Sequence, residues 1–500
     1  MNKKIINYLS LFFLILINVF LDLNIKKYIE VLSKCFNKDI TLTLYLYSII
    51  CAIIALISFL IYLSIKLLVL NKKDEVKGIN LKAEDGTYGT ANWLVDNEIS
   101  NILGTNNEPG ILLGKKNGCN VVLPFDSYFN KNILVIGSSG SGKSVAFAIP
   151  NILELARLGK SMIITDSKGK LYQETAYMLQ KRGYKVRLLN LCDMAHSDRW
   201  NPLSEIENIN DAQNAADIII SNTQKHNKKN SDDFWPRAEE NLLKAFLLYF
   251  HERMIETNTL TNIYMKIASG DINAIDSMFA SLSSDSPARM SYNIFAGGSD
   301  TIKASVLTGL GTRLQAFQNQ LVQNLTSNTD IDLTLPAKEK CAYFVITSDM
   351  DTTYDFLSSL FYTFLFIKLI RYADSTPKGI CNIEVFFLLD EFANIGAIPD
   401  FNKKISTCRS RNIAIIPIIQ NIAQIKNRYP QDVWQEIIGN CDTRVCLGCT
   451  DTLTAEYISD LLGVSTAESQ SIRKEAGIDG EFNYRTKEYY NNTKKVAKSR

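Results

Sequence analysis

The chain has 500 residues, 46% of them hydrophobic, which is enough to bury a large core in more than one domain and excludes a disordered protein. Its 54 Lys and Arg residues are balanced by 52 Asp and Glu residues, so the formal net charge is only +2. This balance excludes a protein that coats nucleic acid over its whole surface, and any DNA contact must be local.

The N-terminal part of the chain contains two apolar runs, at residues 5–23 and 42–65. Each is near the roughly 20 residues that a helix needs to cross the hydrocarbon core of a bilayer. A cleaved signal peptide is the alternative for the first run, but no small-residue cleavage site follows it. Lysines before the first run and after the second favour both termini in the cytoplasm. The sequence therefore predicts a membrane anchor with two transmembrane helices over residues 1–75.

The stretch at residues 132–144 carries the most specific motif. An apolar run predicts a buried parallel strand, and the residues after it match G-x-x-x-x-G-K-[ST]. In this pattern glycines let backbone N–H groups wrap around phosphates, and the helix expected at 145–158 directs its positive dipole end at the anion. Lys143 would reach the β- and γ-phosphates of ATP, and Ser144 would bind Mg²⁺. The residues expected to contact the nucleotide are Gly137, Ser138, Ser139, Gly140, Ser141, Gly142, Lys143 and Ser144.

Strands and helices alternate on both sides of this motif. Short strands are expected at 110–114 and 121–124, and a buried strand at 161–165 is followed by an amphipathic helix at 171–180. This alternation predicts the first part of an α/β nucleotide-binding domain over residues 76–203.

Residues 204–333 show helix after helix with hardly any strand. Apolar residues recur at helical spacing over 211–222, 234–253, 271–282 and 304–317. The basic patch at 225–229 could meet a phosphate backbone, although a solvated loop is the favoured interpretation of a charge run of this size. The pattern predicts an all-α domain inserted into the nucleotide-binding domain.

The second part of the nucleotide-binding domain is expected over residues 334–480, beginning with a strand at 341–346. The strongly apolar stretch at 356–370 resembles a membrane span, but it is short and contains Ser358, Ser359 and Lys368. It also lies between two strands of the nucleotide domain. We therefore predict a buried core helix there.

A second apolar strand, at 385–389, ends in two adjacent acids. Asp390 would hold Mg²⁺ through its water shell, and Glu391 would take a proton from the attacking water. With both parts of the site present, the sequence predicts a P-loop ATPase that hydrolyses ATP.

Two further residues flank the strand expected at 413–419. Gln420 lies at its tip, where a side-chain amide beside the γ-phosphate can report hydrolysis. Arg409 lies where it could enter the nucleotide site of a neighbouring subunit, although a surface arginine is more often simply a solvent-exposed side chain.

Ten cysteines are scattered along the chain with only three histidines, which argues against a disulfide framework and a His-rich metal site. Cys446 and Cys449 have C-x-x-C spacing. We interpret their surroundings as a strand, in which residues three apart point to opposite faces.

Several of these motifs together resemble the VirD4/TraG family of type IV secretion coupling proteins, and the resemblance covers nearly the whole chain. The residues that carry it, besides the two apolar runs and residues 137–144, are Thr165-Asp-Ser-Lys-Gly169, Asn201-Pro-Leu203, Asp233-Phe-Trp235, Leu389-Asp-Glu-Phe-Ala-Asn-Ile-Gly396, Ile398-Pro-Asp-Phe401 and the run from Arg409 to Gln420.

The resemblance implies a RecA-like ATPase domain with an all-α domain, assembled as a hexamer around a channel in the bacterial cell membrane, with the ATPase in the cytoplasm. Such proteins bring relaxase-bound single-stranded DNA to the components of a type IV secretion channel and power conjugative transfer. Carried over, the family's catalytic positions fall on Lys143, Ser144, Asp390 and Glu391, its arginine finger on Arg409 and its γ-phosphate sensor on Gln420.

Two features depart from the family pattern. Some relatives have an arginine before the strand that enters the phosphate loop, whereas Lys131 stands here and cannot make a forked contact. The chain also stops where relatives continue, which leaves open a fragment or a naturally short member. Its basic tail at 481–500 is expected to be disordered.

Two other function classes stay open. A coupling ATPase for protein substrates only would use the same motor, because no motif chooses between DNA and protein cargo. A DNA pump of the FtsK/HerA type, unrelated to conjugation, is the other alternative.

Overall fold

The computed structural model describes residues 79–81, 91, 93–105, 108–223, 234–253, 258–464, 467–469, 471–475 and 482–486. The chain divides into two compact units, residues 1–92 with 464–494 and residues 93–463 with 495–500. The two predicted transmembrane runs and the basic patch at 225–229 lie outside the described residues.

The described part of the smaller unit consists of short antiparallel strand pairs. Strand β1 (Ile79–Leu81) pairs with β12 (Ala467–Ser469), and β13 (Ser471–Glu475) pairs with β14 (Phe482–Thr486). Residues 482–486 lie within the tail that the sequence analysis expects to be disordered, and they form strand β14 in this pairing. In this segment Phe482 and Tyr484 alternate with polar residues, a pattern that suits a strand, and pairing with β13 satisfies its backbone groups.

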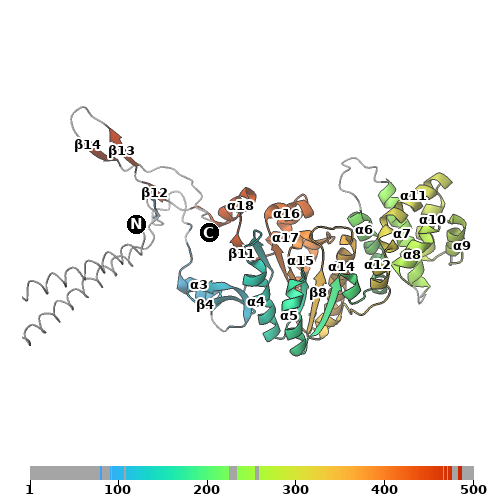
Figure 1. The fold of residues 1–500 in the computed structure, drawn as a ribbon, viewed down its shortest axis with the longest axis horizontal. Helices are drawn as coiled ribbons and strands as arrows, with labels where there is room; N and C mark the ends of the chain where they lie inside the picture. The colour runs from blue at the N-terminus through green and yellow to red at the C-terminus, as the bar shows by residue number, and fades with distance from the viewer. Residues whose placement is uncertain are drawn as a thin grey trace, which may run out of the picture. The chain divides into compact units, whose positions relative to one another are not determined.

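A seven-stranded parallel sheet organises the larger unit (Figure 1). Its strand order is β11-β5-β10-β9-β6-β8-β7, and every neighbouring pair is parallel. The strands are β5 (Ile133–Gly137), β6 (Ser161–Thr165), β7 (Lys185–Asn190), β8 (Cys341–Ile346), β9 (Val385–Leu389), β10 (Ile413–Ile419) and β11 (Thr443–Gly448). The carboxyl ends of these strands therefore share one edge, where open α/β sheets bind their ligands.

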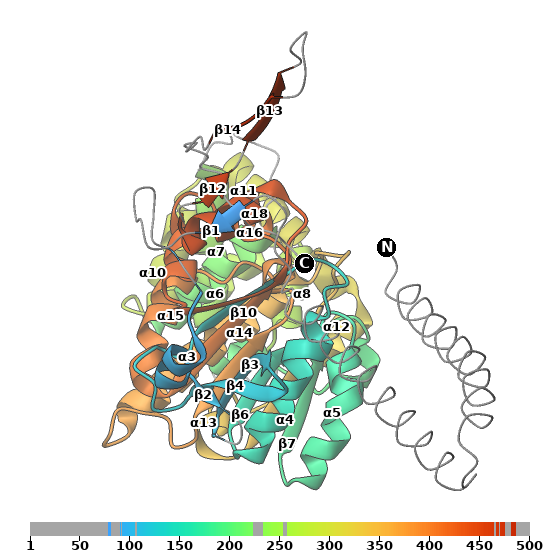
Figure 2. The same cartoon turned by 90° about the vertical axis from the view of Figure 1, so that its left-hand side faces the viewer.

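Alternation along the central strands divides the buried side chains between two cores. Val135 and Phe386 join the core formed with α4 (Ile149–Arg157) and α5 (Lys170–Lys181), which pack against each other (Figure 2). Phe387, one residue along β9, joins the core that contains most of helix α14. Helices on both faces explain why these strands are apolar throughout.

Helix α14 (Asp355–Ser375) is the one described helix long and apolar enough to cross a membrane. In its most apolar window 78% of the residues are buried inside the protein. The ring of Phe366 in this helix stacks on the ring of Phe387 in β9, with the two ring centroids 4.4 Å apart. The prediction of a buried core helix is confirmed.

The helices α6 to α12 lie between β7 and β8 in the chain and gather at one end of the larger unit (Figure 1). Their core contains aromatic rings, among them Phe279 stacked on Tyr292 at 4.0 Å. Helices α8, α10 and α12 were not among the individual helices predicted, and the expected 304–317 helix is split into α11 and η5. The elements are α6 (Ile209–Thr223), α7 (Phe234–Glu252), α8 (Leu260–Ala268), α9 (Ile272–Ala280), α10 (Pro287–Ala296), α11 (Asp300–Arg313), η5 (Gln315–Gln318) and α12 (Gln320–Leu325).

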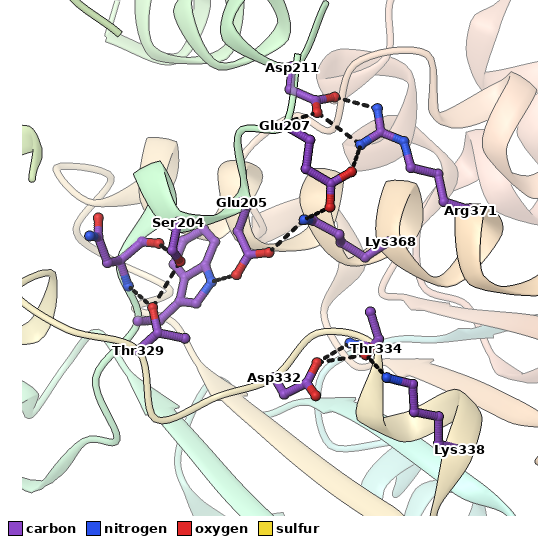
Figure 3. A network of polar contacts seen from close by, with 12 residues as sticks. Ser204, Glu205, Glu207, Asp211, Thr329, Asp332, Thr334, Lys338, Lys368 and Arg371 are labelled. Carbon is purple, nitrogen blue, oxygen red and sulfur yellow. Dashed lines mark hydrogen bonds and ion pairs between the residues drawn. The ribbon is translucent and has the colours of Figure 1, made fainter. Parts of the chain in front are cut away.

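Helices α6 and α14 run antiparallel and join the helical region to the sheet at both of their ends. At one end Arg371 makes two hydrogen bonds, of 2.6 and 2.9 Å, to the fully buried carboxylate of Asp211, and Lys368 donates to Glu207 at 2.6 Å (Figure 3). At the other end Asn222 donates to Ser359 Oγ at 3.3 Å. Polar contacts therefore hold the junction at both ends of this helix pair.

A small antiparallel sheet, of order β2-β4-β3, lies beside α4 (Figure 2). Asn151 of α4 both accepts from and donates to the backbone of Leu112 in β3, which fixes the helix that follows the phosphate loop. The remaining elements are α3 (Asp96–Ile102), β2 (Gly104–Thr105), β3 (Gly110–Lys116), β4 (Cys119–Pro124), η2 (Lys143–Ala148), η3 (Met194–His196), η4 (Pro202–Glu205), α13 (Leu335–Lys338), η6 (Phe392–Asn394), α15 (Phe401–Cys408), η7 (Arg409–Arg411), α16 (Ile422–Arg428), α17 (Val433–Gly439) and α18 (Thr452–Leu462).

Candidate nucleotide-binding site

The phosphate loop follows β5 directly and leads into the helical turn η2. Gly140 and Gly142 have φ angles of 78° and 85°, a left-handed backbone that only glycine adopts without strain. At Gly137 a Cβ atom would lie 2.4 Å from Ser141 Oγ, so a side chain there would fill the loop. These three glycines explain why the sequence pattern is needed for the loop's shape.

The loop has the features of an anion cradle. Ser141 Oγ is buried and has no hydrogen-bond partner among the described residues, so a donor group is available in the loop. The amino end of η2, continued by α4, adds the positive end of a helix dipole. The residues present thus fit the phosphates of a nucleotide.

Lys143 is the buried cation of this loop. Its Nζ donates to the carbonyl oxygens of Gly137 at 2.6 Å and Ser138 at 3.3 Å. Burial lowers the pKa of Lys143, and the positive charge of Lys168 acts in the same direction, although the nearby carboxylates oppose both. A bound phosphate would supply the negative charge that a buried ammonium group favours.

Ser144 and Asp390 meet across the sheet edge. Ser144 Oγ donates to Asp390 Oδ2 at 3.2 Å, and the other oxygen of Asp390 accepts the backbone N–H of Glu391 at 3.0 Å. Burial raises the pKa of Asp390, and the charge of Glu391 raises it further, against the hydrogen bond from Ser144. A hydroxyl and a buried carboxylate are oxygen ligands of the kind that Mg²⁺ takes, so this pair fits the metal predicted from the sequence.

Glu391 has a left-handed backbone, with a φ angle of 51°, that is uncommon for a residue with a side chain. Its two carboxylate oxygens accept hydrogen bonds from different residues. Asn394 Nδ2 donates to Oε2 at 3.1 Å, and Gln420 Nε2 donates to Oε1 at 3.4 Å. The predicted base and the predicted sensor are thus in direct contact.

Arg409 lies before the amino end of β10, whereas Gln420 follows the carboxyl end of the same strand, on the side of the sheet where the phosphate loop lies. The seven residues of β10 span roughly 20 Å at about 3.3 Å per residue, which is beyond the reach of an arginine side chain. Arg409 donates to the carbonyl of Tyr128 at 3.5 Å and lines a cavity of about 150 Å³ that Lys131 also lines. Lys131 forms an ion pair with the buried carboxylate of Glu384. The structure therefore brings together all the predicted site residues except Arg409.

Sequence reasoning assigned no role to Asn394. The signal available was its spacing, because a residue three positions after Glu391 faces it when the backbone makes a single 3₁₀ turn. Nothing in the sequence marked that turn, since Phe392 and Ala393 are equally compatible with a helix or a loop.

Comparison with known proteins gives consistent matches. The sequence profile of the family described as "Type IV secretory system Conjugative DNA transfer" matches residues 86–496. Protein VirD4 of Rhizobium radiobacter is 26% identical over 399 residues, or 77% of this chain and 56% of that protein, and Protein VirD4 of Rhizobium rhizogenes is 25% identical over 398 residues, or 77% and 57%. The chain thus spans little more than half the length of these curated relatives.

Among solved structures, the plasmid coupling protein TrwB in complex with the ATP analogue ADPNP gives a TM-score of 0.57 at 17% sequence identity, covering 76% of this chain and 83% of that one. The unbound monoclinic form of TrwBdeltaN70 gives a TM-score of 0.56 at 17% identity, with coverages of 80% and 85%. The fold is therefore TrwB-like, an α/β fold with a parallel sheet and a helical region, as the sequence predicted for a RecA-like NTPase.

Proposed function

The chain belongs to the type IV secretory system conjugative DNA transfer family, and from this premise we propose that it is a membrane-anchored ATPase that couples ATP hydrolysis to the transfer of single-stranded DNA. The observation that carries the proposal is the meeting of the phosphate loop, Ser144, Asp390 and Glu391 at one sheet edge. This arrangement supports hydrolysis as well as binding, because different groups of the site contact the phosphates, the metal and the attacking water.

Each residue has a distinct task in the proposed reaction. Lys143 binds the β- and γ-phosphates, and the backbone N–H groups of the loop orient them. Ser144 and Asp390 hold Mg²⁺, which when bound neutralises charge on the phosphates. Glu391 accepts a proton from the attacking water at its carboxylate, and Gln420 orients that water beside the γ-phosphate.

The position of Arg409 supports action on a neighbouring copy. Its own nucleotide site lies at the other edge of the sheet, so it needs a second subunit to contact a phosphate. Packing of the amino-end side of one copy against the carboxyl-end side of the next is heterologous, and such contacts form a ring when the rotation between copies closes. We assign a hexamer, the assembly that the coupling-protein resemblance implies, with Arg409 stabilising the charge on the transferring phosphoryl group.

In this function the two apolar runs of residues 1–75 lie in the bacterial cell membrane and the ATPase lies in the cytoplasm. The ring would receive single-stranded DNA attached to a relaxase and pass it to the components of a type IV secretion channel. Membership of the conjugative DNA transfer family supports these partners.

The test uses the full chain in lipid nanodiscs and measures ATP hydrolysis with and without single-stranded DNA at several salt concentrations. We expect stimulation by DNA, with an affinity that falls with salt and depends little on base sequence. Lys143→Ala is the matched control, which should still bind DNA but hydrolyse ATP at least about 10²-fold more slowly. Stimulation by a relaxase protein and never by DNA would instead favour the protein-only coupling ATPase.

A further inference from the structure

A large cavity lined mostly by residues with polar side chains lies at the carboxyl ends of the strands, between the helical region and the segments after β8, β9 and β10. Its volume is about 1220 Å³. We call it the junction cavity and define it by the side-chain amides that line it, which are Asn222, Gln315, Gln318, Asn319, Gln424 and Asn427, together with Asn394.

Asn394 belongs both to this cavity and to the catalytic site. Its side-chain amide donates to Glu391 Oε2 at 3.1 Å, and its backbone N–H donates to the carbonyl of Glu391 at 2.7 Å. The 3₁₀ turn η6 that links the two residues is short, so a displacement of Asn394 would directly change the position of the Glu391 carboxylate.

The segment after the catalytic acids is also bonded to the cavity walls. Arg428 donates to the carbonyl of Ala393 at 2.9 Å and lies 3.5 Å from the carboxylate of Asp355. Asn222, from helix α6, donates to the carbonyl of Ala397 at 3.4 Å. Since Arg428, Asp355 and Asn222 all line the cavity, a ligand in the cavity contacts the same groups that fix this segment.

We propose that Asn394 is a positioning residue that restrains Glu391, and that a single DNA strand entering the junction cavity draws the Asn394 amide away and so releases the base. The inference rests on the proposed function. A hydrogen bond to a carboxylate is among the stronger ones, and it holds in place one of the two oxygens that could accept the proton of the attacking water. Losing this donor leaves Glu391 with the contact from Gln420 alone, which at 3.4 Å is the longer of the two.

The chemistry of the cavity favours a nucleic acid strand. Its volume exceeds the roughly 300–1,000 Å³ of sites for small molecules, so it suits a segment of a polymer. An amide side chain carries both a donor and an acceptor, so it can pair with the edge of any base, and only an unpaired strand presents these edges fully. Tyr354 is among the lining residues, and its side chain is aromatic, the kind on which bases stack. Asn394 is one of these amides, so the base it bonds would compete with Glu391 for the same donor.

The experiment compares Asn394→Ala with the wild type, both as the full chain in nanodiscs, in ATP hydrolysis with and without an oligonucleotide of single-stranded DNA. We expect the DNA-free kcat of the variant to rise by about tenfold, the effect of one charge-assisted hydrogen bond, with KM for ATP unchanged. Added DNA should then give little further stimulation. Asn394→Gln, which keeps an amide donor, should retain a low DNA-free rate.

The matched control is Asn402→Ala. Asn402 donates to Glu436 Oε2 at 2.5 Å, so this change also removes an Asn–Glu hydrogen bond from the nucleotide domain, but away from the cavity and the acids. Its DNA-free rate and its stimulation should equal those of the wild type.

Three results would overturn the inference while leaving the proposed function intact. The first is a kcat that falls equally with and without DNA in Asn394→Ala, because Asn394 would then orient Glu391 productively. The second is unchanged kinetics in that variant. The third is normal DNA stimulation after the DNA-free rate has risen. A wild type that no single-stranded DNA stimulates, but a protein cargo does, would instead remove the proposed DNA function and the DNA part of this inference.

Discussion

The hydroxyl of Ser144 donates a hydrogen bond to Asp390 at 3.2 Å across 246 positions of the chain. The helical region lies within that interval, yet it does not disturb the site. The chain leaves the sheet after β7 and returns at β8, and these two strands are neighbours at the edge of the sheet. The helical region is therefore inserted between the outermost strand and its neighbour. The pairing of the central strands, and the positions of the residues at their ends, are unaffected.

The first prediction concerns the two groups that handle phosphate and water. Lys143→Ala should reduce ATP turnover by about 10²-fold or more through weakened nucleotide binding, because the buried ammonium group is lost. Glu391→Gln should bind ATP with wild-type affinity and hardly hydrolyse it, because only the proton acceptor is lost. Steady-state hydrolysis and equilibrium binding of a fluorescent ATP analogue separate the two. Glu154→Gln, which changes a carboxylate bonded to Arg157 on α4, is the control. Equal turnover in Glu391→Gln and wild type would remove Glu391 as the base.

The second prediction concerns Mg²⁺. Ser144→Ala should raise the Mg²⁺ concentration needed for half-maximal hydrolysis, and Asp390→Asn should raise it further, because a carboxylate is the stronger ligand for a hard cation. A Mg²⁺ titration at fixed ATP measures both. Ser410→Ala, which changes an exposed hydroxyl bonded to a backbone carbonyl, is the matched control. Identical Mg²⁺ dependence in all the proteins would contradict the assignment of this pair.

The third prediction is that Arg409 acts on the nucleotide of a neighbouring subunit. Arg409→Ala should lose rate by about 10³ while keeping its ATP affinity. Mixing Arg409→Ala with Lys143→Ala subunits should restore part of the activity, because some interfaces then combine an intact arginine with an intact site. Arg411→Ala is the matched control, since Arg411 pairs with Asp374 of its own chain at 2.7 Å. A mixture that forms rings and stays inactive would make Arg409 a structural residue and Lys131 the next candidate.

The fourth prediction concerns the pH dependence of stability. Burial raises the pKa of Asp355 to about 6, although Arg428 opposes the shift. Because the folded pKa lies above the ordinary value near 3.9, the protonated acid stabilises the fold, and this contribution is full below about pH 4 and lost as the pH rises through about 6. Asp355→Asn removes the ionisation. Relative to wild type it should therefore gain stability as the pH rises, by up to about 3 kcal/mol at pH 8.

Thermal unfolding of both proteins between pH 4 and pH 8 measures this difference. Asp374→Asn is the matched control, since it changes a half-exposed carboxylate on the same helix. A constant difference between Asp355→Asn and wild type over this range would show that Asp355 does not ionise within it.

Much of the fold could be predicted from the sequence because the central strands are buried on both faces. Strands β6, β8, β9 and β10 have the predicted bounds, since a parallel strand between two helical layers is a continuous apolar run. Strand β7 was not predicted, because Lys185 and Arg187 interrupt its apolar pattern. It lies at the edge of the sheet, where such residues reach solvent.

Local residue patterns suffice to predict which chemical groups the site contains, because the backbone requirements of the phosphate loop and of the two acids are visible in the residue types. The tertiary structure alone decided which distant groups meet. Gln420 reaches Glu391, whereas Arg409 is separated from both by the length of β10, and Asn394 faces Glu391 only because the backbone there turns through a left-handed residue. These relations depend on strand order and on single backbone angles, which arise from packing over the whole sheet and leave no local trace in the sequence.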